Sequence, residues 1–474
     1  MKNNPHPTPR VWLAKPSDER EASTYGWDTV FAVRVDDANA LIRKAKSSPP
    51  SFSCTLDEGY QLHGSFGDWQ IGLGGDCKLI HFYLPLVRVE IQSAHGTHAL
   101  EGVTAEVELR LQFVPQPTLS ATGGTTHHLR VDARAPTSQQ AATVCDLHVA
   151  DGKPALGFVD DVALRSGLEQ WLNANLSVFT HVFSVIEVGE HAEGAFAWLK
   201  PTSIGYAYVD GPSAEESLLG VLCMTEGRSA ARLLPQLSAN AIPPGARAGF
   251  LISQTMFLEN ILLPNLPGVF KGSATSDYGL MEDLRGIEAL KTLTLSAVEH
   301  DGKQYTPTLE QMNVRITEQE IHFMAQTRVE ISPGIYSHCE HHSFLTIVVE
   351  QRANGPTFVF KTLREPTSHD WTTHDDGIDI MEEILAIIAA VVGVLVTILT
   401  GGAAAVAVIL IAGLIYGVAK LTPEILAAVG TDDAPALDLM TLNATKPIRW
   451  TDGKDFTPLS AALNGALQLG GNAI

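Results

Sequence analysis

An uncharged apolar run near the end of the chain constrains the fold more than any other feature. From Ile384 to Ala419 the chain contains no Asp, Glu, Lys or Arg. A single membrane crossing takes about 20 apolar residues, so the run is too long for one span. The pair Gly401-Gly402 divides it into halves of about 17 residues, each about 25 Å long as a helix. We therefore predict a helical hairpin over 379–422, apolar on every side, which must be buried in protein or lipid.

The ends of the run also favour helices. Asp379 and Glu382 have the spacing of a capping box, Lys420 suits a helix C-terminus, and Pro423 can end a second helix. Three interpretations of the hairpin are open: a buried core element, a segment that inserts into a membrane conditionally, or a permanent membrane anchor. Short halves rich in Ala and Gly favour burial at neutral pH. The flanking acids lose charge near pH 4 or so, which predicts conditional membrane contact in an acidic compartment.

The acidic composition of the chain excludes some functions. A net charge of −21 over 474 residues argues against a nucleic-acid binder. The small basic group Arg43, Lys44 and Lys46 is more typical of a solvated helix face than of a lipid-binding patch. Five scattered cysteines form no disulfide framework, and the polar start has no apolar stretch of a signal peptide. We therefore expect synthesis in the cytoplasm, with later release left open.

Most of the remaining chain has strand periodicity. Apolar and polar residues alternate from Val103 to Phe113 and from Ile321 to Ile331, as in antiparallel sheets with one buried face. Helices are expected over 36–45, 162–176 and 246–263, the last ending before Pro264. Because these helices do not alternate regularly with the strands, we predict an α+β, strand-rich fold rather than a parallel doubly wound sheet.

The densest polar cluster is His338-Cys339-Glu340-His341-His342. Metal sites use such residue types. The cluster leads into the apolar strand predicted at 343–350, which would place His338, Glu340 and His342 on one face. Ligands spaced about 7 Å apart along a strand do not converge on one ion. These three residues are therefore weak metal candidates, and an exposed polar strand is the main prediction.

Other polar motifs indicate no catalytic site. Gly72-Leu73-Gly74-Gly75 lacks the helix of a dinucleotide-binding fingerprint and predicts a tight turn. His369-Asp370 and His374-Asp375-Asp376 read as a polar loop before the hairpin. Because no set of nucleophile, base and oxyanion donors is recognisable, we predict no enzymatic activity and no cofactor.

Several segments together resemble a known family. They are 24–31 (TYGWDTVF), 198–202 (WLKPT), 250–253 (FLIS), 331–335 (ISPGI), 456–465 (FTPLSAALNG) and 469–471 (LGG). In order and spacing they are similar to the forty-seven-kilodalton proteins encoded beside clostridial neurotoxins in orfX-type gene clusters. The similarity extends from about Ser23 to Gly471.

This resemblance implies the tubular lipid-binding (TULIP) superfamily, in which strongly curved antiparallel sheets wrap around long helices. The composition predicts a polar tail at 1–23, and the arrangement of strands and helices predicts a division near Asp210. With the resemblance, 24–210 and 211–474 are expected to be two TULIP-like modules, the second including the hairpin. The implied function is that of a non-enzymatic accessory protein that contacts a toxin, another cluster-encoded protein, or lipid. The alternatives are an intracellular acyl-chain carrier and a membrane-inserting protein. For the carrier, the candidate groove residues are Phe250, Met256, Phe257 and Ile261.

Overall fold

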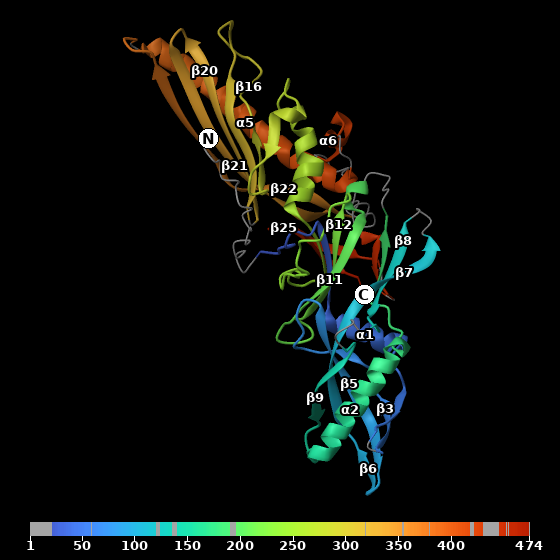
Figure 1. Ribbon diagram of the computed structural model, residues 1–474. Coiled ribbons are helices and arrows are strands. Elements are labelled where there is room, and N and C mark those ends of the chain that lie inside the picture. Colours follow the sequence, from blue (N-terminus) through green and yellow to red (C-terminus); the bar gives the residue numbers. More distant parts are fainter. Residues whose placement is uncertain are drawn as a thin grey trace, which may run out of the picture.

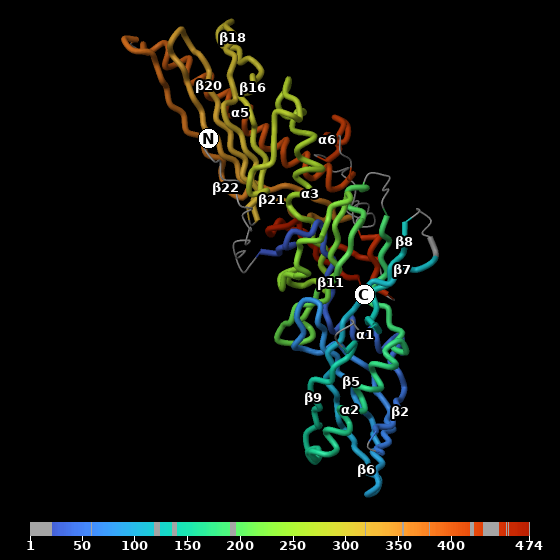
Figure 2. The backbone as a smooth tube through the Cα atoms, viewed as in Figure 1, coloured from blue at the N-terminus to red at the C-terminus, as the bar shows by residue number. Residues whose placement is uncertain are grey.

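Three antiparallel sheets follow one another along the long axis of the molecule, so that a central sheet carries a wing at each end (Figure 1). The structure, a computed structural model, describes residues 21–57, 59–119, 124–134, 140–189, 196–317, 319–352, 355–378, 380–417, 421–429, 445–451, 453 and 455–473. We call 35–188 the lower wing and 253–429 the upper wing. The backbone trace shows that the two wings point away from each other (Figure 2).

The lower wing is a sheet against which α2 (Phe158–Asn175) lies, in contact with β2, β5 and β9. Its strands run in the order β2-β3-β5-β7-β8-β10-β23, while β4 and β6 pair with β5 and β9 pairs with β7. Helix α1 (Val35–Ala45) leads into this wing. The strands are β2 (Ser51–Thr55), β3 (Gln61–Phe66), β4 (Gln70–Ile71), β5 (Leu79–Ser93), β6 (Gly96–Leu100), β7 (Val103–Leu119), β8 (Thr125–Val131), β9 (Thr143–Val149), β10 (Ser184–Val188) and β23 (Ile448–Trp450).

Period-two patterning gave correct strands. The predicted strand 103–113 is the first part of β7, and its alternate residues from Val103 to Leu111 are buried. The predicted strand 321–331 lies within β20 (Glu320–Ser332), where Ile321, Phe323, Val329 and Ile331 are buried. The predicted helices 36–45 and 162–176 correspond to α1 and α2. The strand-rich, antiparallel prediction is therefore confirmed.

The central sheet joins the start of the chain to its end. Its order is β11-β12-β1-β13-β25-β24. Strand β1 lies between β12 and β13, and β13 pairs in turn with β25. The sheet thus draws strands from both sides of residue 210, and the division into two modules there stays a prediction. The strands are β1 (Thr29–Arg34), β11 (Pro201–Val209), β12 (Leu218–Thr225), β13 (Ala248–Ile252), β24 (Thr457–Asn464) and β25 (Ala466–Asn472).

The upper wing is built on long strands in the order β14-β15-β19-β20-β21-β22, with β16 paired to β19. Strands β17 (Val298–His300) and β18 (Lys303–Tyr305) form a separate pair. Helix α5 (Glu382–Tyr416) contacts β20, β21 and β22. The other strands are β14 (Tyr278–Leu280), β15 (Gly286–Ala289), β16 (Leu293–Thr294), β19 (Thr308–Thr317), β21 (Ile335–Arg352) and β22 (Gly355–His374).

The apolar run forms one continuous helix, α5, so the predicted hairpin is wrong. Gly401 and Gly402 lie inside this helix, where each costs only about 1 kcal/mol relative to Ala. The sequence there offers no Pro, Asn or Asp to reverse the chain. At 1.5 Å per residue α5 is about 52 Å long. The long strands β20 to β22 provide a face of comparable length, which a straight helix covers better than a hairpin of two short ones.

The ends of α5 also differ from the expectation. Its N-cap is Met381, without a capping side-chain hydrogen bond, so the predicted capping box does not form. Asp379 and Lys420 lie outside the described residues. The helix ends at Gly417, whose φ of 66° is the left-handed conformation typical of a helix C-terminus. Pro423 does not end a helix but begins α6 (Pro423–Val429), as a proline in a first helical turn can.

The predicted helix 246–263 is wrong in its first half. Ala248–Ile252 is strand β13, buried along its whole length between β1 and β25. A short apolar run buried on both faces has no helical or strand period, so its periodicity could not decide between the two. The helical part begins after Ser253 with α3 (Gln254–Phe257) and continues through a π-helical turn at Leu258–Leu262. It passes Pro264 within α4 (Leu263–Asn265).

Of two segments predicted to lack regular structure, one is confirmed and the other is wrong. The segment 72–75 is a turn between β4 and β5, as predicted, with Gly74 at a φ of 94°. His369 and Asp370 belong to β22 rather than to a loop, and that strand ends only at His374. Because β22 is the outermost strand of its sheet, polar residues can occupy both of its faces. The polar composition was therefore misread as a loop.

Candidate functional site

The second half of α5 is fixed in the core. Every residue from Ile409 to Ile415 is buried. Gly413 lies so close to Ile261 that an added Cβ would come within 2.0 Å of the isoleucine Cγ2. The carbonyl of Gly417 accepts a hydrogen bond from Trp198 Nε1 at 3.2 Å. This half of the helix therefore has no freedom to leave without opening the core.

The first half of α5 has an exposed apolar side. We call it the α5 apolar face, and it consists of the exposed residues Met381, Leu385, Ala386, Ala389, Gly393 and Val394. Leu385 is 51% exposed and Val394 is 42% exposed. By length and composition α5 is able to cross a membrane. The buried side chains of this half lie on the opposite side and are Ile388, Val391, Val392, Leu395 and Leu399.

The sheet under the first half of α5 is partly polar. Its inner face is identified by Phe323, which lies against Gly402 of α5. Toward the tip of the wing this face includes the buried apolar residues Val329, Ile331 and Ile335. Between these and Phe323 the buried residues of β20 and β21 are small or polar, namely Ala325, Thr327, Ser337, Cys339, His341 and Ser343. Such side chains bury less apolar surface than Leu or Phe at the same positions. The sheet face on this side of the upper wing is therefore partly polar rather than continuously apolar.

His341 is the most polar group on this inner face. Its side chain is buried, with Nδ1 2.9 Å from Ser368 Oγ and Nε2 2.8 Å from Ser343 Oγ. Burial lowers the pKa of His341, with a smaller contribution from His342. Both ring nitrogens of His341 thus have hydroxyl partners, and burial disfavours the charged form of the imidazole.

Acidic residues surround the start of α5. Glu382 and Glu383 occupy its first turn, and Asp375 and Asp376 are exposed in the turn that precedes it. Carboxylates are favourable at a helix N-terminus. They also give the α5 apolar face an acidic border, which disfavours an anionic membrane surface at neutral pH.

Helix α2 of the lower wing also begins with exposed apolar residues. Phe158 is 83% exposed, Val159 57% and Val162 46%. Figure 1 shows that α2 and α5 each begin at the tip of their wing and run toward the central sheet. The molecule therefore presents apolar helix starts at both ends.

The predicted lipid-groove residues lie in the core. Phe250, Met256, Phe257 and Ile261 are each at most 2% exposed. Phe250 packs edge-on against Phe31, with ring centroids 5.8 Å apart. The four side chains fill space between the central sheet and α5, and their assignment as groove residues stays a prediction.

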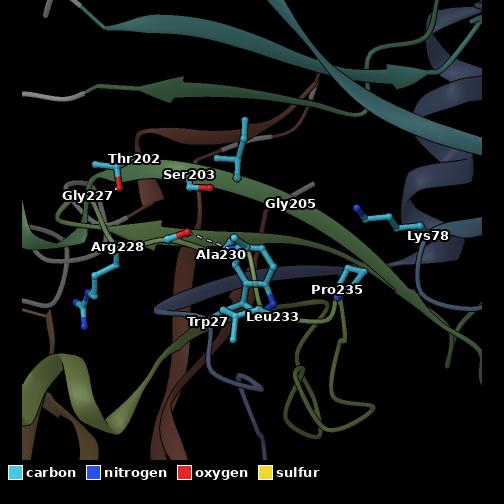
Figure 3. A pocket seen from close by; sticks show the side chains of 13 residues that line it. Trp27, Lys78, Thr202, Ser203, Gly205, Gly227, Arg228, Ala230, Leu233 and Pro235 are labelled. Carbon is cyan, nitrogen blue, oxygen red and sulfur yellow. Dashed lines mark hydrogen bonds between the residues drawn. The ribbon is translucent and has the colours of Figure 1, made fainter. Parts of the chain in front are cut away.

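A cavity of about 800 Å³ lies elsewhere, on the central sheet. Its lining combines β11 with the segment 227–235, and Lys78 and Arg228 lie on opposite sides of it (Figure 3). Trp27 lines it and donates a hydrogen bond from Nε1 to the carbonyl of Leu234 at 3.0 Å. None of the four groove candidates lines this cavity. Its lining mixes polar and apolar residues, and Arg228 forms ion pairs with Asp28, Glu226 and Glu259.

The weak metal candidates lie on the outer face of β21, as predicted. His342 Nδ1 is 2.8 Å from His322 Nε2, and its Nε2 is 2.9 Å from Glu340 Oε1. His338 instead stacks on Trp371, with ring centroids 5.0 Å apart. Among the described residues, His338, Glu340 and His342 do not form a group whose donors could hold one ion. Glu340 and His342 meet, but His338 is directed away from them onto Trp371.

Two features were missed by the sequence analysis. His322 joins the imidazole and phenyl stack of His342 and Phe344 on the outer face of the wing. Its outward position follows from the alternation of the predicted strand 321–331, but its partners become known only when β20 pairs with β21. The exposed start of α2 was missed because Phe158 and Val159 precede the predicted helix at 162.

The fold defines a two-winged protein of antiparallel sheets with one long helix on each wing. The chain belongs to the OrfX-like family, because the family model described as Protein OrfX2/OrfX3/P47 matches residues 24–471. The resemblance noted in the sequence is therefore confirmed at the level of the family.

Relatives extend over nearly the whole chain. It is 28% identical to Protein OrfX3 of Paraclostridium bifermentans, an alignment that covers 96% of this chain and 99% of the relative. Protein OrfX3 of Clostridium botulinum (strain Kyoto / Type A2) is 27% identical, with 95% and 98% covered. The solved structure of P47 from Clostridium botulinum A2 matches with a TM-score of 0.66 at 18% identity, over 96% of this chain and 99% of that one. That match shows a shared fold. The names of the family and these relatives denote no enzymatic activity.

Proposed function

We propose that this protein is a non-enzymatic accessory protein of a toxin-type gene cluster, made in the cytoplasm and acting through contacts of a TULIP-like fold. Family membership and the position of one long helix on each wing support this proposal. The observation that carries it is the α5 apolar face, because a row of exposed apolar side chains on one helix marks a contact surface.

The α5 apolar face is suited to a protein partner at neutral pH. Full burial of one Leu- or Val-sized side chain contributes about 1.5–3 kcal/mol. Met381, Leu385 and Val394 supply several such side chains along one side of a helix. Docking of a helix into an apolar groove uses this arrangement. The acidic border at Glu382 and Glu383 favours a partner whose groove has a basic rim.

Insertion of α5 into a membrane is the second candidate function. The first half of α5 lies on the partly polar inner face, and protonation of the buried His341 would weaken that contact. A released first half would present to lipid a helical segment that has no charged residue after Glu383. This function is expected under acidic conditions, when the imidazole gains its proton.

The carrier function depends on space beside Phe250, Met256, Phe257 and Ile261, which pack closely in the core. Native mass spectrometry of the purified protein is the direct test. Co-purifying acyl lipid would support a carrier, while lipid-free protein that takes up no fluorescent fatty acid would contradict it.

The contact surface is tested with the double variant L385E/V394E. These exposed positions accept charge without opening the core, so the variant is expected to fold. Its affinity for proteins encoded by neighbouring genes, measured by biolayer interferometry, is expected to fall more than tenfold. V87E is the matched control, since Val87 is 60% exposed on β5 of the lower wing. Equal affinity of the double variant and the unaltered protein would contradict the proposal.

Flotation with phosphatidylcholine vesicles separates the protein-contact and membrane functions. Protein contact predicts no flotation at neutral pH. Flotation that appears only at acidic pH and is lost in L385E/V394E would support insertion of α5. Absence of flotation at both pH values would contradict the proposal that α5 inserts into membranes.

A further inference from the structure

Three donor side chains that are far apart in the sequence meet on the outer face of the lower wing. One donor atom each from His81, Glu108 and Cys145 lie within 4.8 Å of one another. They come from β5, β7 and β9, three strands that are adjacent in the sheet. An imidazole, a carboxylate and a thiol are all ligands of zinc, and this separation is close to that of ligands around a single ion.

The strand pairing explains why these residues meet. His81 of β5 lies directly opposite Glu108 of β7. The pairing of β7 with β9 shifts register between Glu106 and Val107, which takes Cys145 out of the regular alternation. Arg165 of α2 donates hydrogen bonds from Nη1 to the carbonyls of Val144 and Cys145, at 2.9 and 2.8 Å. The backbone beside the thiol is therefore held by a second element.

A carboxylate outside the group orients the histidine. Glu106 Oε1 lies 2.7 Å from His81 Nδ1, and Glu106 Oε2 lies 2.7 Å from His148 Nε2. A histidine that binds a metal through one ring nitrogen commonly donates its other N–H to a carboxylate. Because Nδ1 of His81 is engaged with Glu106, Nε2 is the nitrogen left for a cation.

The glycine-rich turn at 72–75 lies next to His81 and Glu106. The segment 72–75 passes beside His81, and a Cβ added to Gly74 would lie 3.1 Å from His81 Nδ1 and 3.9 Å from Glu106 Oε1. Gly74 has a φ of 94°, a conformation that L residues rarely adopt. The turn thus approaches the His81–Glu106 pair more closely than a chain with a side chain there would allow.

We propose that His81, Glu108 and Cys145 bind one zinc-class divalent cation, with Glu106 as a positioning residue. A thiolate and an imidazole select such a cation over Ca²⁺ and Mg²⁺, which prefer oxygen ligands. Three protein ligands leave a fourth tetrahedral position for water or a donor from another molecule. The site is independent of the α5 apolar face, which lies on the other wing.

Binding is tested on the untagged full-length chain with Zn²⁺ and with Co²⁺ as a spectroscopic probe. We expect one equivalent of Zn²⁺ by isothermal titration calorimetry and a thiolate-to-cobalt charge-transfer band. C145S should remove the band, and E108Q should weaken Zn²⁺ binding at least tenfold. C54S is the matched control, because Cys54 is a partly buried free thiol of β2 in the same wing. A band that survives in C145S, or the absence of stoichiometric Zn²⁺ binding, would overturn the proposal.

The positioning role of Glu106 has its own readout. E106Q keeps the shape of the side chain but weakens its hold on His81, and we expect Zn²⁺ affinity to fall about 10- to 100-fold. The cobalt charge-transfer band should persist at saturating Co²⁺, because the thiol ligand is unchanged. Unaltered Zn²⁺ affinity in E106Q would contradict this role. Circular dichroism of each variant shows whether the fold is kept.

Discussion

The two wings place a helix on a sheet in different ways. Helix α2 has 18 residues and buries Leu164, Leu168 and Leu172 against the lower sheet. Helix α5 has 35 residues and is apolar on all sides, but only its second half is enclosed. The inner face of the upper sheet includes the buried polar side chains Thr327, Ser337 and His341, whereas the lower wing has large buried apolar side chains such as Leu62 and Phe82. Both helices leave apolar side chains exposed near their starts, but α2 has a polar side as well, whereas α5 is apolar along its whole length after Glu383.

The largest difference in stability is expected between alanine variants of a buried leucine in α2 and of an exposed leucine in α5. L168A removes a side chain with no exposed surface, and should lower the free energy of unfolding of the lower wing by about 2–5 kcal/mol. L385A, at a position that is 51% exposed, should change stability by about 0.5 kcal/mol or less. Chemical denaturation, with hydrogen exchange to resolve each wing, measures both. Similar losses for the two variants would mean that the first half of α5 is as firmly packed as α2.

A smaller difference in stability is expected between glycine-to-alanine variants in the two halves of α5. G413A places a methyl group within 2.0 Å of Ile261 Cγ2, and should cost roughly 1–3 kcal/mol of stability. G401A adds its methyl group where no other atom lies within 4 Å, so the higher helix propensity of Ala should stabilise by up to about 1 kcal/mol. Denaturation midpoints of the two variants give the comparison. Destabilisation by G401A would indicate that the middle of α5 needs its glycines.

The smallest expected effect is a dependence of the stability of the upper wing on pH. Burial lowers the folded-state pKa of His341, so between that value and the unfolded value of about 6.5 only the unfolded form binds the proton. Stability conferred by this site is therefore complete above about pH 6.5 and is lost as the pH falls. Burial lowers the pKa of His322 and His338 as well, which adds to the effect in the same direction.

After correction for the intrinsic exchange rate, which itself falls with pH, hydrogen exchange in the first half of α5 should therefore be faster at acidic than at neutral pH. H341Q should reduce this difference, because Gln has no proton to gain. H95Q is the matched control, since His95 is exposed in the turn between β5 and β6 of the other wing. An equal acceleration in H341Q would show that the pH dependence arises elsewhere.

Local patterns predicted a large part of the fold. Alternation of apolar and polar residues predicted β7 and β20, and an apolar stripe of helical period predicted α2. One buried face imposes such a period, and it can be recognised in a single sequence. The absence of charge over 384–419 correctly indicated an apolar helical element. It did not indicate one helix rather than two, because the cost of Gly401 and Gly402 in a helix is small beside the gain from the long sheet.

Contacts between distant segments could not be predicted in this way. Ala248–Ile252 is a strand only because β1 and β25 flank it, and its own composition fits a helix equally well. The sequence pointed to His338, Glu340 and His342 as metal candidates because they are adjacent in the chain. The structure instead gathers His81, Glu108 and Cys145, which share no local motif and meet through strand pairing alone.

The pairing within the central sheet has a consequence for the order of folding. Strand β1 ends at Arg34, yet its partners begin at Leu218 and Ala248, and β13 pairs with β25 near the end of the chain. Closing such long loops costs entropy, so contacts of this kind form late. During synthesis the lower wing has nearly all its strands before β1 has a partner. Strands β24 and β25 must emerge from the ribosome before the central sheet can be complete, so the sheet that joins the two wings is among the last parts of the molecule to form.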